Sequence, residues 1–168
     1  MQRGIGFWYQ LSGIGKFKIF GYCKKYSLEP IVQIANINIP LFISKESNVD
    51  IEIFKKREKW CMFDLEISWL SQLISIETAE QLEKIMDIIP DVLKKECQKL
   101  IDITKNISYE KVKISPIYYS AMKYYDNIYY RVIEGNLTLA KGGGYKSDGI
   151  KSLGFALYTD NLLKVMEG

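Results

Sequence analysis

The spacing of apolar residues changes near Asn106, and this change limits the folds open to the chain. Residues 78–105 place apolar side chains three and four positions apart, as in amphipathic helices. After Asn106, β-branched and aromatic residues fill short runs that are typical of strands. These runs are 112–117, 128–134, 137–141 and 153–157. Helices followed by consecutive strands predict an α+β fold in which an antiparallel sheet has a helical segment packed beside it.

The helical segment is expected to span 48–106. Asn48 or Asp50 has the side chain to cap its first helix. Thr78 begins a TAEQ motif with the spacing of a capping box. Pro90 should then end one helix and start the next, because proline lacks the N–H that a helix interior needs. A helical hairpin is the expected result.

The sheet is expected to occupy 107–168 together with a terminal helix, and Gly135-Asn136 fits a tight hairpin turn. Upstream, residues 31–37 are β-branched and bounded by Pro30 and Pro40, which predicts a buried strand. Residues 1–30 show no sustained period, so they stay unassigned. Within them, strand and short helix both remain open for 16–22.

A chain of 168 residues is the size of one domain, so we treat 1–168 as a single domain. The net charge of +3 is too small to predict a nucleic-acid or membrane partner by bulk attraction. The basic cluster at 55–57 could contact RNA, but acidic neighbours favour a solvated helix face. The sequence also lacks an apolar run of the ~20 residues that a bilayer demands.

The sequence contains no histidine. This excludes Ser-His-Asp and Cys-His nucleophile pairs and every metal site with an imidazole ligand. Its cysteines, Cys23, Cys61 and Cys97, are far apart and form no CxxC motif. Reduced core thiols are therefore favoured over a zinc or redox site, and we expect no metal, no cofactor and a cytoplasmic location.

Three ordered segments near the C-terminus carry a resemblance to a known family. They are KYYDNIYYRVIEG at 123–135, LAKGGGYK at 139–146 and LGFALYTDNLL at 153–163. Together they resemble the last part of a class II histidyl-tRNA synthetase core, whose members carry an RGFDYYTG segment, a GGRYD loop and a GFAL strand. More weakly, 32–44 resembles the strand and helix start that precede the family's helical insertion. The resemblance implies the class II synthetase type of antiparallel sheet.

The sequence departs from that family where an active synthetase carries arginine. Ser120 stands at the arginine of the histidine segment, Asn161 at the ATP-contacting arginine, and Gly144 at the arginine of GGRYD. Neither serine nor asparagine can replace the planar, permanently charged guanidinium group when charge develops on phosphate oxygens. Aminoacylation is therefore not expected, and no catalytic residue is assigned.

The segment from Ser120 to Tyr125 resembles the arginine-free version of the histidine segment that is found in the regulatory subunits of ATP phosphoribosyltransferase. These subunits share the synthetase-like fold. This resemblance implies a non-catalytic protein of histidine biosynthesis that activates a short catalytic subunit, with histidine as an allosteric effector. The match is to the C-terminal portion of the core. If an upstream half is normally present, the apolar surface that it would cover must here be hidden by residues 1–30 or by assembly into a homo-oligomer.

The resemblance also implies a ligand pocket. Its expected residues are Ser120, Tyr124, Tyr125, Gly142, Gly143, Gly144, Tyr145 and Gly154. Tyrosine hydroxyls can position a polar amino acid, and glycines allow close approach of a strand backbone. The alternative is that the tyrosines pack the core and the glycines only turn the chain. Histidine binding would also need a counter-charge for its ammonium group, for which Glu134 and Asp148 are the candidates.

Two other functions remain open at this point. The chain could be a fragment or paralogue of histidyl-tRNA synthetase that retains adenylation, although Ser120 and Asn161 predict that it does not. It could also be an RNA-binding module that retains shape recognition without chemistry. The near-neutral charge and the absence of a basic stripe disfavour that third function.

Overall fold

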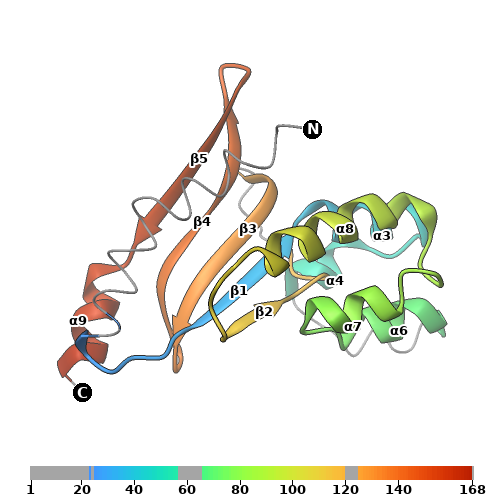
Figure 1. Ribbon diagram of the computed structural model, residues 1–168. Coiled ribbons are helices and arrows are strands. Elements are labelled where there is room, and N and C mark those ends of the chain that lie inside the picture. The colour runs from blue at the N-terminus through green and yellow to red at the C-terminus, as the bar shows by residue number, and fades with distance from the viewer. Residues whose placement is uncertain (1–22, 24, 57–65, 120–124, 168) are drawn as a thin grey trace.

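The computed structural model describes residues 23, 25–56, 66–119 and 125–167, which form one sheet with helices (Figure 1). The strands are β1 (Ile31–Asn36), β2 (Val112–Ile114), β3 (Tyr125–Glu134), β4 (Leu137–Ser147) and β5 (Ile150–Leu157). The helices are α3 (Asn38–Glu46), α4 (Ile51–Lys56), α6 (Ser68–Ile74), α7 (Ala79–Lys84), α8 (Asp91–Lys105) and α9 (Thr159–Glu167). The α+β prediction is confirmed.

The sheet has the strand order β2-β1-β3-β4-β5. Strands β3, β4 and β5 run antiparallel to their neighbours, and β1 pairs antiparallel with β3, so the expected antiparallel sheet is present. One pair departs from that expectation, because β1 and β2 are parallel. A parallel pair needs a long crossover, and here the helical segment between the two strands provides it.

The strands of the C-terminal region are longer than the sequence runs that predicted them. Strand β4 continues through Gly142, Gly143 and Gly144 to Ser147, although glycine is a poor strand former. Hydrogen bonding to β3 on one side and β5 on the other holds this stretch extended. The predicted run at 112–117, in contrast, is a strand only over Val112–Ile114, because Pro116 cannot donate to the ladder.

Local signals place several helix starts correctly. Thr78 and Gln81 form both hydrogen bonds of the capping box at the start of α7, and the Asp50 carboxylate accepts from the Glu52 N–H at 2.9 Å before α4. Helix α8 begins directly after Pro90. Helix α7 ends at Lys84, however, so a stretch of turns rather than helix leads to that proline. The sequence reading did not identify α6.

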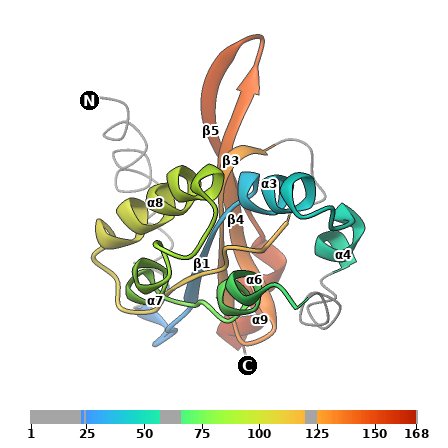
Figure 2. The same ribbon diagram turned by 90° about the vertical axis from the view of Figure 1, so that its right-hand side faces the viewer.

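Helices α3 and α8 cover one face of the sheet, which we call the helix face (Figure 2). The main core lies between these helices and the sheet. It includes the fully buried side chains of Ile34, Ile39, Leu100 and Ile114. Side chains alternate along a strand, so Val32 and Ile34 point toward this core and Gln33 points away. The helix face is therefore dominated by apolar packing.

One polar link joins the sheet to α8 inside this core. The Asn36 side chain, fully buried, donates to the Glu96 carboxylate at 2.7 Å and to the Glu96 carbonyl at 3.2 Å. Burial works to raise the pKa of Glu96, but hydrogen bonds from Lys99 and Asn36 outweigh it and hold this pKa below 4.5. A buried charge is tolerated here because it is paired and hydrogen-bonded.

The far edge of the sheet carries large exposed apolar side chains. On β5, Ile150 is 68% exposed and Phe155 54% exposed, and Leu163 of α9 is 52% exposed. Within the described residues, strand β5 has a strand neighbour on one side only. Assembly into a homo-oligomer that would cover such surface stays a prediction.

Candidate functional site

The sheet face opposite α3 and α8 carries a separate group of tyrosines, and we call it the tyrosine face. Tyr129 is its centre: the Tyr118 ring stacks on it with centroids 5.3 Å apart and planes 7° apart. Tyr125 meets the same ring edge to face at 5.1 Å. Beneath them, Ala35 and Ile37 complete a buried apolar cluster that is distinct from the main core. The tyrosine face thus has its own packed base.

Polar groups flank this base on the same face. Arg131 stands beside Gln33 in strand register, and its Nε donates to the Gln33 side-chain oxygen. Gln33 in turn donates to the Ser115 hydroxyl, and the Arg131 guanidinium lies 5.1 Å from the centre of the Tyr118 ring. A guanidinium over a ring is attracted by the negative ring face. The position of Arg131 is therefore set from two sides.

The glycines of β4 make room for tyrosine rings. A Cβ atom on Gly143 would lie 2.7 Å from Cδ1 of Tyr125 and 2.5 Å from the Ile128 carbonyl oxygen. On the opposite face, a Cβ on Gly142 would lie 2.7 Å from the Tyr130 hydroxyl. Both distances are shorter than real contacts, so a side chain at either position would displace its neighbours. The glycines are thus part of the way the tyrosines are seated.

Burial keeps the hydroxyls of these tyrosines protonated. Desolvation raises the pKa of Tyr125 and that of Tyr129, and it raises the pKa of Tyr130 to about 12. A second effect on Tyr129 comes from neighbouring Tyr118. Tyr130 lies on the helix face and the Tyr129 hydroxyl is hydrogen-bonded to Tyr118, so of these three hydroxyls it is that of Tyr125 that is considered for a ligand.

The structure brings together some of the predicted pocket residues. Tyr125, Gly143, Tyr145 and Gly154 share the tyrosine face, with Tyr125 opposite Tyr145 and Gly143 opposite Gly154 in register. Their neighbours Gly142 and Gly144 lie on the same strand but face the other side of the sheet, the helix face, because successive residues of a strand alternate between faces. Ser120 and Tyr124 lie outside the described residues. Whether the assembled residues bind a ligand stays a prediction.

Several residues of this face were missed by sequence reasoning. Tyr118 and Tyr129 form the stacked pair, and Arg131 and Lys141 stand opposite each other in register. Two-residue spacing along β3 relates Tyr129 to Arg131, and this alternation was a usable signal. The stacking of Tyr118 had no such signal, because it comes from the segment after β2.

The two carboxylates considered as counter-charges lie away from Tyr125. Glu134 is at the opposite end of β3, where its charge acts on Cys23 and Tyr109. Asp148 is in the turn between β4 and β5. The side-chain oxygen of Asn127, two residues from Tyr125, is buried without a hydrogen-bond partner in the described part of the chain. A buried acceptor of this kind favours an incoming donor.

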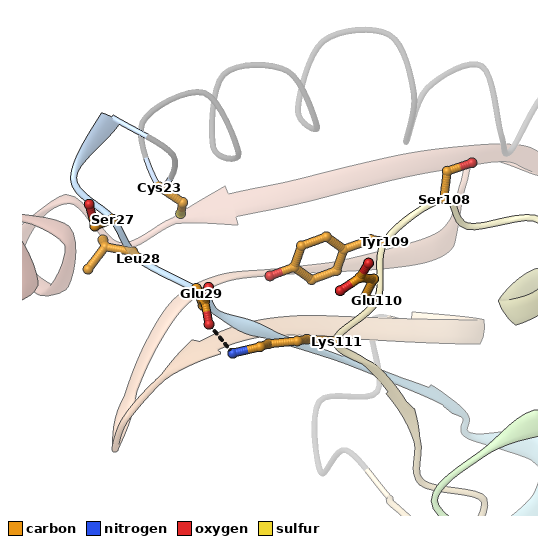
Figure 3. A pocket seen from close by; sticks show the side chains of 8 residues that line it. All are labelled: Cys23, Ser27, Leu28, Glu29, Ser108, Tyr109, Glu110 and Lys111. Carbon is orange, nitrogen blue, oxygen red and sulfur yellow. Dashed lines mark hydrogen bonds and ion pairs between the residues drawn. The ribbon is translucent and has the colours of Figure 1, made fainter.

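A surface pocket of about 600 Å³ lies elsewhere, where the segment before β1 meets the segment before β2 (Figure 3). None of the predicted ligand residues lines it. Three of its polar groups already have partners, since Glu29 pairs with Lys111 and the Tyr109 hydroxyl donates to the Pro30 carbonyl at 2.6 Å. Burial raises the pKa of the Cys23 thiol beside it, which disfavours a nucleophile. We therefore place the candidate site on the tyrosine face.

Within the described ranges, no group of three His, Cys, Asp or Glu side chains is arranged to hold a metal ion. Within the same ranges, no helix is both long and apolar enough to span a membrane. Asn161, at the position implied for the ATP-contacting arginine, donates through its side chain to the Thr138 carbonyl at 2.8 Å. That amide helps to fasten α9 to β4.

Comparison with curated proteins finds two relatives, although no family model matches the sequence. The chain is 37% identical over 141 residues to the ATP phosphoribosyltransferase regulatory subunit of Wolinella succinogenes, covering 84% of this chain and 49% of that protein. It is 34% identical over 140 residues to the protein of the same name from Helicobacter hepaticus, covering 83% and 50%. The chain thus spans about half the length of the curated relatives it matches.

Solved structures share the fold. An ATP phosphoribosyltransferase regulatory subunit/histidyl-tRNA synthetase from Bacillus halodurans superposes with a TM-score of 0.65 at 14% identity, over 83% of this chain and 45% of that one. A chain of the ATP phosphoribosyl transferase (HisG:HisZ) complex from Thermotoga maritima gives 0.50 at 14% identity, over 76% and 53%. The predicted class II synthetase type of sheet is thereby confirmed. From these identities, the chain is a homologue of the ATP phosphoribosyltransferase regulatory subunits over about half of their length.

Proposed function

We propose that the chain acts as a non-catalytic regulatory subunit that binds a short catalytic ATP phosphoribosyltransferase subunit and activates it in histidine biosynthesis. The observation that carries this proposal is the 37% identity over 141 residues to a protein of that name. The structural neighbour from Thermotoga maritima is a chain of an ATP phosphoribosyl transferase (HisG:HisZ) complex, which supports a partner of the catalytic type. The chain spans about half the length of its curated relatives. That it has the activity of a whole regulatory subunit is therefore proposed here.

The absence of synthetase chemistry is supported by the residues at the expected arginine positions. The Asn161 amide donates to the Thr138 carbonyl, so it serves a structural contact. An amide also has no charge with which to stabilise a developing phosphate anion. We therefore expect no histidine-dependent exchange between ATP and pyrophosphate, and measurable exchange would favour the synthetase-fragment alternative.

Histidine is the proposed effector, and its proposed site is the part of the tyrosine face around Tyr125 and Tyr145. The Tyr125 hydroxyl stays protonated and can donate to a carboxylate, while the rings supply an apolar wall. The buried Asn127 oxygen can accept from an ammonium group. Histidine would inhibit by binding the less active arrangement of the complex more tightly.

We also propose a single domain over residues 1–168 and a cytoplasmic location. The sheet and the main core link β1, from the start of the described chain, to β5 and α9 at its end. Buried Cys23 and Cys97 are free thiols, which suits a reducing compartment.

The test is reconstitution with a purified short catalytic subunit. Sedimentation velocity should show a complex, and turnover should rise above that of the catalytic subunit alone. The proposal is contradicted if sedimentation shows no complex and turnover does not change.

The effector site is tested in the same mixture. Added histidine should lower turnover, and Tyr125→Phe should weaken this inhibition while leaving activation intact. Tyr109→Phe, in the pocket of Figure 3, is the matched control and should leave inhibition unchanged. Equal responses of the two variants would exclude the tyrosine face as the histidine site.

A further inference from the structure

Two positive side chains stand directly opposite each other on the tyrosine face. Arg131 of β3 and Lys141 of β4 are Cα partners in the strand register. Strands β3 and β4 are neighbours inside the sheet, between β1 and β5 (Figure 1). Directly opposed residues of an antiparallel pair have Cβ atoms about 5 Å apart. One anion between the two strands is therefore within reach of both side chains.

Hydrogen-bond donors surround the two charges. Among the described residues, the structure gives Arg131 a hydrogen bond at Nε, to Gln33, and the guanidinium group has further N–H donors at its Nη atoms. The Lys141 ammonium lies 5.2 Å from the centre of the Tyr158 ring. A hydrogen bond with the Tyr158 hydroxyl is the main cause that raises the pKa of Lys141, so the ammonium stays charged.

The position of the guanidinium is fixed before any ligand arrives. Gln33 holds Nε, Ser115 accepts from Gln33, and the Tyr118 ring lies beneath the guanidinium carbon at 5.1 Å. Tyr118 is itself stacked on Tyr129. Because this support is in place, little side-chain ordering is needed when a ligand binds.

We propose that Arg131 and Lys141 form a binding site for the phosphate group of a small molecule. A phosphate group carries roughly 1.5 to 2 negative charges near neutral pH, which matches two cations better than the single charge of a carboxylate. Its tetrahedral oxygens can accept from the guanidinium fork and from the ammonium group at once. The site is on the same face as the proposed histidine site, but it does not rest on the proposed regulatory function, because it is measured on the isolated chain.

The test is calorimetric titration of the full 168-residue chain with inorganic phosphate, with acetate at equal ionic strength as the comparison. Phosphate should bind saturably, with one site per chain, and should raise the melting temperature through linkage. Arg131→Gln and Lys141→Gln should each weaken binding about tenfold to hundredfold, which is the effect of one hydrogen bond to a charged group. Arg131→Lys keeps the positive charge but not the guanidinium fork, so it should weaken phosphate binding less than Arg131→Gln does.

Lys151→Gln is the matched control, because Lys151 is an exposed lysine on β5 of the same sheet. It should leave phosphate affinity unchanged. The proposal is overturned if phosphate does not bind saturably, if acetate binds as tightly, or if Lys151→Gln weakens binding as much as Lys141→Gln. Should Arg131→Gln fail to fold by circular dichroism, the comparison of the Lys141 and Lys151 variants decides alone.

Discussion

Gly143→Ala should destabilise the protein, while Gly144→Ala, one residue further along β4, should not. The added methyl group at Gly143 would lie 2.5 Å from the Ile128 carbonyl oxygen, a backbone atom, and 2.7 Å from Cδ1 of Tyr125. Overpacking of this kind costs about 1–3 kcal/mol. At Gly144 the nearest atom, Cδ2 of Leu153, is 4.0 Å away, so an ordinary contact forms. There the reduced freedom of the unfolded chain should give a gain of roughly 0.5–1 kcal/mol.

The measurement is urea unfolding of the two variants beside the unchanged protein, followed by far-ultraviolet circular dichroism. The free energies of unfolding of the two variants should differ by about 2 kcal/mol or more, which a linear extrapolation resolves. Near-ultraviolet dichroism should also change in Gly143→Ala, because Tyr125 must move. Equal midpoints for the two variants would refute the claim that the glycine at 143 makes room for the ring.

Other regions of the fold yield further predictions. The Glu96 carboxylate, with its folded pKa below 4.5, contributes stability that is full above about pH 4.5 and is lost as pH falls through the folded value. In Glu96→Gln the urea midpoint of unfolding should therefore fall less at acid pH than it does in the unchanged protein. An equal fall in the two proteins would contradict this. Burial raises the pKa of Cys97 to about 12, so peptide mapping after alkylation near pH ~8 should find it unmodified until urea is added. Modification of native protein at Cys97 would count against this. Thr78→Ala should lower the free energy of unfolding by about 1 kcal/mol through loss of the cap, and an identical urea curve would argue otherwise.

The coverage of the relatives bears on what the chain does in a complex. The chain matches about half of each curated relative and 45% of the Bacillus halodurans structure. Its described part nevertheless has a continuous five-stranded sheet and a main core. The exposed apolar residues of β5, such as Phe155, lie at the outer edge of that sheet. Reconstitution therefore needs sedimentation alongside turnover, so that assembly and activation are measured separately.

Features that depend on neighbouring residues could be predicted from the sequence. The capping box at Thr78, the helix start after Pro90 and the turn at Gly135 are short-range signals, because their hydrogen bonds join residues only a few positions apart. The ordered motifs near the C-terminus also indicated the relatives and the antiparallel sheet. Strand length was less accessible, since the pairing of β4 on both sides overrides the weak strand preference of its glycines.

The arrangement of the tyrosine face depends on contacts between residues that are far apart in the sequence. Arg131 meets Gln33 across 98 positions of sequence, and Tyr118 reaches Tyr129 by leaving β2 and crossing to the other side of the sheet. The parallel pairing of β1 with β2 likewise depends on a crossover through the helical segment. Contacts between distant residues follow from strand order and register, which no local pattern of residue types encodes. For that reason the sequence could place Tyr125 and Tyr145 in a candidate pocket, but it could not place Arg131 beside Lys141.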